Sequence, residues 1–308
     1  MQQGSSISTS ELPVIYKRGK NLLQSGAWRA KERLDAGVVH LRTLTQGLPN
    51  PSILLDGLGQ SNSGELVKTS GQPEIVPVVL MDLLSSLPEN NEGKITLGLD
   101  FNSQPIQLNL LNNEVGNVLI SGMKGAGKSS LLRTIGASVA LHNRQSTVQL
   151  GVIDLNLGKL SLQNKRESLR GLGQLPHSIF PVIRTVQGGL DVIDFLTDEL
   201  NYRRENEIHN PIMVVIIDGI GKLLANADRV LYRKLGHLLN HGPDNGFRLF
   251  VSIEDPIAKD IRPLLKYDFP LRLVGRAVDP DRAWAAAGIP GTGAEMLQGS
   301  GVFVAVRG

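Results

Sequence analysis

The segment Gly122 to Ser129 constrains the fold of this chain more than any other part of its sequence, because it matches the pattern G-x-x-x-x-G-K-[ST] at every fixed position. It follows the short apolar run Asn117 to Ile120 and precedes Ser130 to Ile135, which has the apolar spacing of a helix. Glycines in such a turn let backbone N–H groups face inward, and the helix directs the positive end of its dipole at the same point. The sequence therefore predicts a strand, a phosphate-binding loop and a helix. A chance match of a glycine-rich turn is the alternative.

The pattern also gives tasks to single side chains. Lys128 is expected to reach the β- and γ-phosphates of a nucleotide, and Ser129 is expected to hold Mg²⁺. The cofactors that follow are ATP and Mg²⁺. The residues expected around the phosphates are Gly122, Met123, Lys124, Gly125, Ala126, Gly127, Lys128, Ser129 and Ser130.

A second carboxylate is needed to complete the magnesium shell, and Asp218 is the best candidate. It follows the six apolar residues Ile212 to Ile217, which together have the form of a Walker B element. A buried parallel strand carries its last residue to the edge of the sheet where phosphates bind. The alternative is an Asp that caps the strand in a turn. Asp154 ends the run Leu150 to Ile153 in the same way, but an Asp before Leu-Asn-Leu-Gly can also only shape a turn.

From Lys94 onward, short apolar runs alternate with helical stretches, which is typical of a mostly parallel sheet covered by helices on both faces. The expected strands are Ile95 to Leu99, Ile106 to Asn109, Asn117 to Ile120, Val148 to Ile153, Ile212 to Ile217, Phe247 to Val251, Leu271 to Val274 and Val302 to Val306. The expected helices are Lys128 to His142, Leu190 to Glu207, Arg229 to His241 and Ala283 to Ala287. This pattern predicts an α/β domain over residues 94–308.

The sequence before this domain has a different texture. Between Glu11 and Arg42 there are seven Lys or Arg against three Asp or Glu. Apolar residues recur there every three or four positions, from Leu23 to Leu41, which describes one face of an amphipathic helix. Such a helix can lie on a membrane surface, on nucleic acid or on its own domain. Several prolines then break the chain between Gln46 and Gly93. We expect a flexible N-terminus over residues 1–12 and a basic helix with a Pro-rich linker over 13–93.

Composition excludes several kinds of site. The 308 residues include no cysteine, so disulfides, Cys-based zinc sites and thiol catalysis are excluded. With 41% hydrophobic and 20% charged residues the chain can bury a sizeable core. There is no run of about 18 apolar residues, and the polar start of the chain lacks the apolar centre of a signal peptide. We expect a cytoplasmic protein without a transmembrane segment. A net charge of +3 allows a polyanionic partner without arguing for one.

Taken together, these motifs resemble the FtsK/SpoIIIE-type DNA-pumping motors, which are members of the RecA-like ATPases. The resemblance runs from about Ile95 to Val306. Its most specific part after the phosphate loop is the closing segment Gly288 to Gly301, which is similar to the Gly-Ala-Glu-x-Leu-x-Gly-x-Gly stretch of the family. Further matches are Leu97 to Asp100, Ile153-Asp154, Leu175 to His177, and Glu199 with Arg203.

The resemblance implies a RecA-like P-loop fold assembled as a ring, with ATP at the subunit interfaces and double-stranded DNA in the channel. We therefore expect a homo-oligomer or a mixed ring, with double-stranded DNA as partner. In such rings an arginine supplied in trans stabilises the charge that develops on the transferred phosphoryl group. Arg203 and Arg282 match arginines of the family pattern, and Arg276 is a weaker candidate.

This sequence departs from the family where hydrolysis is concerned. Asp218 is followed by Gly219, where the family has the Glu that polarises the attacking water. The polar sensor at the end of the next strand is replaced by Glu254 and Asp255. RecA-like sheets place that strand between the phosphate-loop strand and the Asp218 strand, so Glu254 is expected near the γ-phosphate. It can orient water as a base, repel the γ-phosphate, or face away and pair with Arg248 or Lys259.

Three functions follow as alternatives. One is an ATP-driven translocase on double-stranded DNA, and another is an ATP-binding structural ring subunit that hydrolyses weakly or not at all. The third is a type VII secretion-type ATPase, since the same family includes engines that move protein. The expected catalytic residues are Lys128 and Asp218, with Glu254 as the candidate base and Arg203 as the candidate arginine in trans.

Overall fold

The structure is a computed structural model, and it describes residues 40–43, 92–156, 169–225, 227–299 and 301–307. The N-terminus expected to be flexible (residues 1–12), nearly all of the expected basic helix and most of the Pro-rich linker lie outside these ranges. No helix among the described residues has the length and apolar character needed to cross a membrane.

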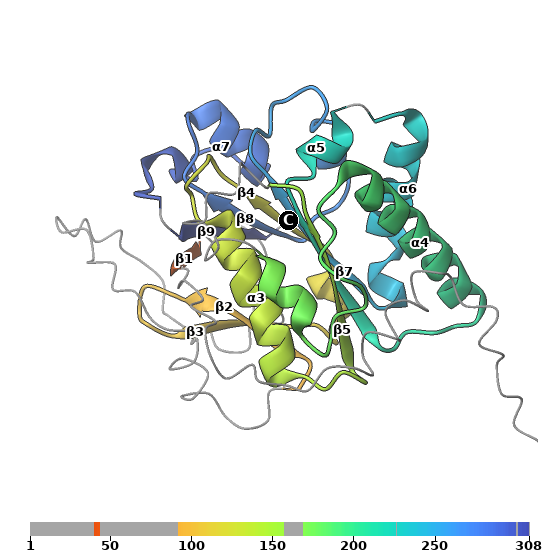
Figure 1. The fold of residues 1–308 in the computed structure, drawn as a ribbon. Coiled ribbons are helices and arrows are strands. Elements are labelled where there is room, and N and C mark those ends of the chain that lie inside the picture. The colour runs from red at the N-terminus through yellow and green to blue at the C-terminus, as the bar shows by residue number, and fades with distance from the viewer. Residues whose placement is uncertain (1–39, 44–91, 157–168, 226, 300, 308) are drawn as a thin grey trace, which may run out of the picture.

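The described residues form a nine-stranded sheet with the order β3-β2-β1-β9-β8-β4-β7-β6-β5 (Figure 1). Neighbouring strands run parallel except in the pairs β2–β3 and β8–β9. The strands are β1 (His40–Thr43), β2 (Lys94–Leu99), β3 (Pro105–Asn109), β4 (Val118–Ser121), β5 (Val148–Asp154), β6 (Ile212–Asp218), β7 (Phe247–Ile253), β8 (Leu271–Gly275) and β9 (Val302–Arg307). The eight strands predicted after residue 94 are therefore confirmed.

Helices account for most of the remaining regular structure. They are α3 (Lys128–His142), α4 (Val186–Glu205), α5 (Gly221–Leu224), α6 (Arg229–His241) and α7 (Pro280–Ala287). α3 and α6 have the predicted bounds, whereas α4 and α7 begin earlier than their apolar residues indicated. The side chain of Thr185 caps α4 and that of Asp279 caps α7, each by accepting a hydrogen bond from a backbone N–H in the first turn.

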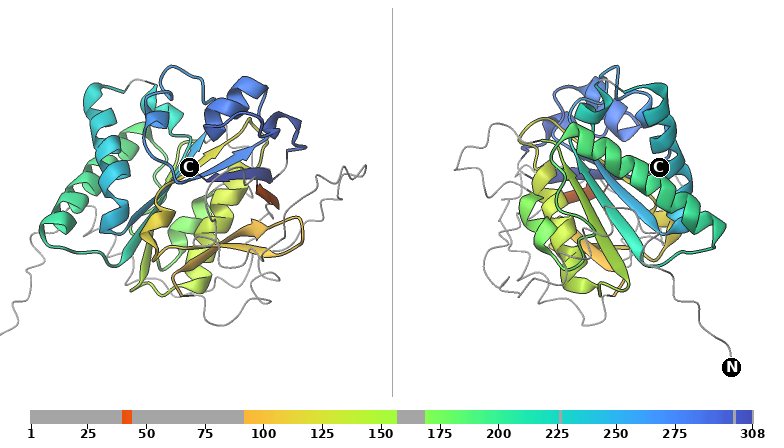
Figure 2. Two further views of the ribbon diagram at one scale, coloured as in Figure 1. Left: turned by 180° about the vertical axis from the view of Figure 1, so that it is seen from behind. Right: turned by 45° about the vertical axis from the view of Figure 1, so that its right-hand side comes forward.

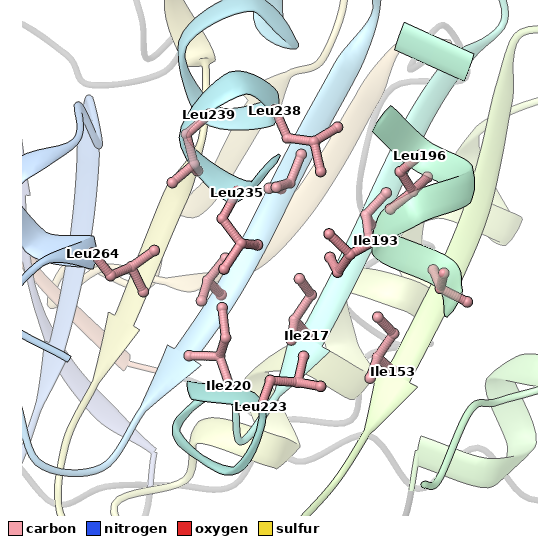
Figure 3. Close-up of a cluster of buried hydrophobic side chains, with 14 of the residues drawn as sticks. Ile153, Ile193, Leu196, Ile217, Ile220, Leu223, Leu235, Leu238, Leu239 and Leu264 are labelled. Atoms are coloured by element: carbon pink, nitrogen blue, oxygen red, sulfur yellow. The ribbon is translucent and has the colours of Figure 1, made fainter. Parts of the chain in front are cut away.

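The alternation of side chains along β6 shows how the helices cover both faces of the sheet. Val214 and Ile216 pack in one core cluster with apolar residues of α3. Val215 and Ile217 point to the other face, where they pack with α4 and α6. Figure 3 shows Ile217 in this cluster together with Ile193 of α4 and Leu235 of α6. The two views in Figure 2 agree that α3 lies on one side of the sheet and α4 and α6 lie on the other. The predicted α/β fold with helices on both faces is confirmed.

β1 is a strand where the apolar spacing predicted the end of an amphipathic helix. Leu41, the last residue of that pattern, pairs with Phe303 of β9, and His40 also pairs with Leu99 of β2. The prediction of a helix is therefore wrong at these residues. A three- and four-residue spacing is a local signal, whereas the hydrogen bonds of a strand depend on neighbours far away in sequence. The sheet thus includes residues that precede the boundary predicted at residue 94.

Arg248 lies fully buried near the start of β7, at the edge of the sheet where β6 and β7 begin. Its guanidinium donates to the carbonyl oxygens of Leu110 (3.1 Å), Pro243 (2.7 Å) and Phe247 (2.8 Å). It also donates to Asn113 Oδ1 at 3.0 Å. Burial lowers the pKa of Arg248 to about 10. Arg248 therefore joins β7 to the segment after β3.

Candidate nucleotide site

The predicted phosphate loop connects β4 to α3, at the edge of the sheet where the parallel strands end. Gly122 has a φ of +153°, and a Cβ atom there would lie 2.9 Å from the Cβ of Ala126 and 3.3 Å from the backbone of Gly275. Only glycine allows this close approach. The backbone N–H of Met123 donates to Arg276 O (2.8 Å), and that of Gly301 donates to Ala126 O (3.0 Å). The end of β8 and the closing glycine-rich segment therefore hold the loop in place.

Lys128 begins α3 and is only 7% exposed. Its Nζ lies inside the curve of the loop, where it donates to Gly122 O at 2.6 Å and to Met123 O at 3.0 Å. Burial lowers the pKa of Lys128, while the carboxylates of Glu254 and Asp218 oppose this change. By contrast, Lys124 in the same loop is exposed.

Asp218, at the end of β6, is 1% exposed and accepts hydrogen bonds from three side chains. Ser129 Oγ donates to Oδ2 at 2.6 Å. Asn156 Nδ2 donates to Oδ1 at 2.9 Å, and Ser252 Oγ donates to the same oxygen. The Ser252 hydroxyl also accepts from Gly219 N at 3.0 Å. The structure thus brings Ser129 and Asp218, both predicted from the sequence, into direct contact.

Sequence reasoning missed Ser252 and Asn156. Ser252 is a hydroxyl residue near the end of the otherwise apolar second half of β7, which is a usable signal. Asn156 belongs to the Leu-Asn-Leu-Gly segment after Asp154, which by itself indicates only a turn. Its contact with Asp218 joins two strand ends, so no local pattern reveals it.

Asp154 ends β5 directly beside Asp218, with which it is in register. It is 4% exposed, and its carboxylate accepts from the backbone N–H of Asn156 (3.3 Å) and of Leu169 (3.4 Å). Burial, followed by the nearby charge of Asp218, raises the pKa of Asp154. Asp154 therefore shapes the turn after β5, and it also adds negative charge close to the site.

Glu254 lies at the same end of the sheet as the phosphate loop. Ser121 pairs with Ile253, so Glu254 is the first residue beyond that pair, next to Gly122. Its side chain is exposed, and its charge acts on Lys128. Within the described ranges no ion pair joins Glu254 to Lys259. Arg248 lies at the opposite edge and bonds other groups. The arrangement in which Glu254 faces away and pairs with either cation is therefore wrong.

Arg203 does not lie where the resemblance placed it. It is 2% exposed, near the C-terminal end of α4. Its guanidinium donates to Glu199 Oε1 and Pro211 O, both at 2.9 Å, and its Cζ lies 5.0 Å from the ring centroid of Phe247. These contacts are at the edge where β6 and β7 begin, away from the phosphate loop. This placement contradicts a role in trans, because the guanidinium is buried within its own subunit.

The two other candidate arginines, Arg276 and Arg282, lie at the same end of the sheet as the phosphate loop. Arg282, in α7, pairs with Asp255 at 3.1 Å and with Asp279. Arg276 has an exposed side chain, and its carbonyl oxygen holds Met123. Both side chains are therefore more accessible than that of Arg203.

A hydroxyl and a carboxylate in contact form a donor set that fits Mg²⁺, which prefers oxygen ligands and keeps several waters and phosphate oxygens. No group of three or more His, Cys, Asp or Glu suited to a metal ion occurs in the described part of the chain. The residues present therefore fit a magnesium ion bound together with a nucleotide.

Comparison with known proteins finds similarity to one family in sequence and to ATPases in fold. The model of the FtsK/SpoIIIE family matches residues 88–211. The chain is 24% identical over 240 residues to the DNA translocase FtsK of Staphylococcus aureus (strain Mu50), covering 70% of this chain and 29% of that protein. It is 26% identical over 229 residues to the DNA translocase SftA of Bacillus subtilis (strain 168), covering 67% and 22%. The chain thus spans less than a third of the length of these curated relatives.

Two solved structures share the fold. The cytoplasmic domain of the type VII secretion ATPase EccC from Thermomonospora curvata superposes with a TM-score of 0.53 at 19% identity, over 68% of this chain and 26% of that one. The pCW3 conjugation coupling protein TcpA, in its monomer form with ATPγS, gives a TM-score of 0.53 at 19% identity, over 72% and 68%. At this identity the likeness shows the fold alone.

Proposed function

We propose that this chain, which matches the FtsK/SpoIIIE family model over residues 88–211, binds ATP and Mg²⁺ at residues 122–130 and acts as an ATP-dependent ring subunit on double-stranded DNA. The observation that carries the nucleotide site is the hydrogen bond between Ser129 and Asp218, because it joins the phosphate loop to the end of β6. The relatives named as DNA translocases support DNA as the polymer.

Each residue has a defined task in this site. Lys128 exchanges the carbonyls of Gly122 and Met123 for phosphate oxygens, which are stronger acceptors because they are charged. The N-terminus of α3 adds its dipole to the same phosphates. Ser129 and Asp218 hold Mg²⁺, which neutralises charge on the phosphate groups when it is bound.

The proposed motor needs a group that orients the attacking water, and Glu254 is the best placed. It is exposed at the loop, whereas Asp154 and Asp218 are buried and hydrogen-bonded. Glu254→Gln is expected to lower ATP turnover by roughly 10²-fold or more and to leave nucleotide affinity unchanged, because it removes a base but keeps the shape. Steady-state turnover and equilibrium binding of ATP measure the two effects.

Asp255→Asn is the matched control, since Asp255 is the next residue and pairs with Arg282. It should keep most of the turnover. If Glu254→Gln instead binds ATP more tightly and turns it over as fast as the wild type, Glu254 repels the γ-phosphate. That result would favour the second candidate, a weakly hydrolysing ring subunit, for which Gly219 is the specific observation.

DNA as partner is tested by ATP turnover with and without duplex DNA. We expect stimulation that falls steeply as salt rises, because counterions released from DNA phosphates drive binding. Lys128→Ala gives the background rate in the same assay. Turnover that is equal with and without duplex at low salt would contradict a DNA motor, and would leave a secretion-type ATPase as the alternative.

A further inference from the structure

We infer that Asn156 is a positioning residue for the magnesium site, which acts by fixing the orientation of the Asp218 carboxylate. The inference rests on the proposed function, because it concerns the same site. It adds a residue that no motif in the sequence identifies.

Asn156 connects the ends of two neighbouring strands. Its Nδ2 donates to Asp218 Oδ1 at 2.9 Å, and its backbone N–H donates to Asp154 Oδ1 at 3.3 Å. Asp154 and Asp218 end β5 and β6 in register. Asn156 therefore holds one carboxylate with its backbone and the other with its side chain, so that its amide is fixed relative to both.

Gly219 provides the space that Asn156 occupies. Its φ is +80°, and a Cβ atom at this position would lie 2.7 Å from Asn156 Oδ1 and 2.9 Å from Asn156 Cγ. A side chain at residue 219 and the carboxamide of Asn156 in its present place exclude each other. Gly219 stands where the family has a Glu side chain at the end of β6. The space that this glycine leaves is occupied by the carboxamide of Asn156, which follows β5.

The two carboxylate oxygens of Asp218 have different hydrogen-bond partners. Oδ1 is held by Asn156 and Ser252, so Oδ2 is turned toward Ser129. Substituting a group that holds a metal ligand in its orientation typically lowers metal affinity 10- to 100-fold. Without Asn156 only Ser252 would hold Oδ1, so the carboxylate would be held less firmly in the orientation that faces the Mg²⁺ position.

The test compares the affinity of a fluorescent ATP analogue in excess Mg²⁺ with its affinity in EDTA, for the wild type and for Asn156→Ala and Asn156→Leu. In EDTA we expect both variants to bind the analogue as tightly as the wild type does. The factor by which Mg²⁺ raises the affinity is expected to be about tenfold smaller in both variants than in the wild type. Leucine fills nearly the same volume beside Gly219 but donates no hydrogen bond. The two variants therefore separate donation from packing.

Asn240→Ala is the control, since Asn240 is exposed on α6 and away from the loop. Because Asn156 is exposed, the melting temperatures without nucleotide should change by no more than about 2 °C. The inference would be overturned if the gain in affinity from Mg²⁺ in Asn156→Ala stayed within about twofold of wild type, or if Asn156→Leu restored that gain. A large drop in the melting temperature of either variant would also overturn it. A wild type without any gain from Mg²⁺ would instead contradict the proposed function.

Discussion

Lys128→Ala is expected to abolish measurable ATP binding. The ammonium group lies inside the phosphate loop, 2.6 Å from Gly122 O, and is almost fully buried. Its hydrogen bonds to phosphate oxygens would be charge-assisted, and such bonds contribute about 1.5–3 kcal/mol each. Losing two of them weakens binding by roughly 100-fold or more. Isothermal titration with ATP and Mg²⁺ is expected to show binding to the wild type and no measurable heat of binding for Lys128→Ala.

Lys124→Ala is the matched control for Lys128→Ala. Lys124 belongs to the same loop and carries the same charge, but its side chain is exposed, and only its backbone N–H is expected to face the phosphates. We expect it to keep most of the affinity of the wild type, because an exposed cation is screened by water and salt. Unchanged affinity in a folded Lys128→Ala protein would disprove the assignment of the loop.

The largest effect on stability is expected from Arg248→Met. Methionine replaces the aliphatic part of the side chain but leaves the carbonyls of Leu110, Pro243 and Phe247 without this donor. A buried polar group left unpaired costs about 1–3 kcal/mol. We expect the free energy of unfolding to fall by about 3–5 kcal/mol, since more than one acceptor is affected. Urea unfolding followed by circular dichroism measures the change.

Arg233→Met provides the comparison, because Arg233 lies exposed on α6. Its effect should stay within about 0.5 kcal/mol, as is usual for surface substitutions. Equal urea midpoints for the two variants would show that the contacts of Arg248 do not stabilise the fold. ATP affinity should change little in either variant while the protein is folded, because both arginines lie away from the phosphate loop.

The fold from residue 94 onward was predictable because its signals are local. Each strand is a short apolar run, and the apolar spacing of α3 and α6 predicted both of their ends. Caps were less visible: Thr185 and Asp279 precede the apolar residues, so α4 and α7 begin earlier than predicted. α5 has four residues, which is too short for any periodicity. β1 was mistaken for helix because its partners are distant in sequence.

The candidate site was also predictable only where its signals are local. The G-x-x-x-x-G-K-[ST] motif identified Lys128 and Ser129, and the buried strand before Asp218 predicted the end of the sheet at which this carboxylate lies. Ser252 and Asn156 reach Asp218 only after β5, β6 and β7 have aligned, so their contacts depend on register. The matching position of Arg203 was misleading, because a sequence pattern does not specify which way a side chain points. In the structure it points into the protein.

The position of β1 also bears on the order in which the protein folds. β1 pairs with β2 on one side and β9 on the other, and these two strands do not pair with each other (Figure 1). Its partner in β9 is separated from it by most of the chain, so closing this contact carries a high entropic cost. β1 is therefore expected to dock late in folding. Until it docks, β2 and β9 each present an open edge, and open edges of this kind promote association between incompletely folded chains.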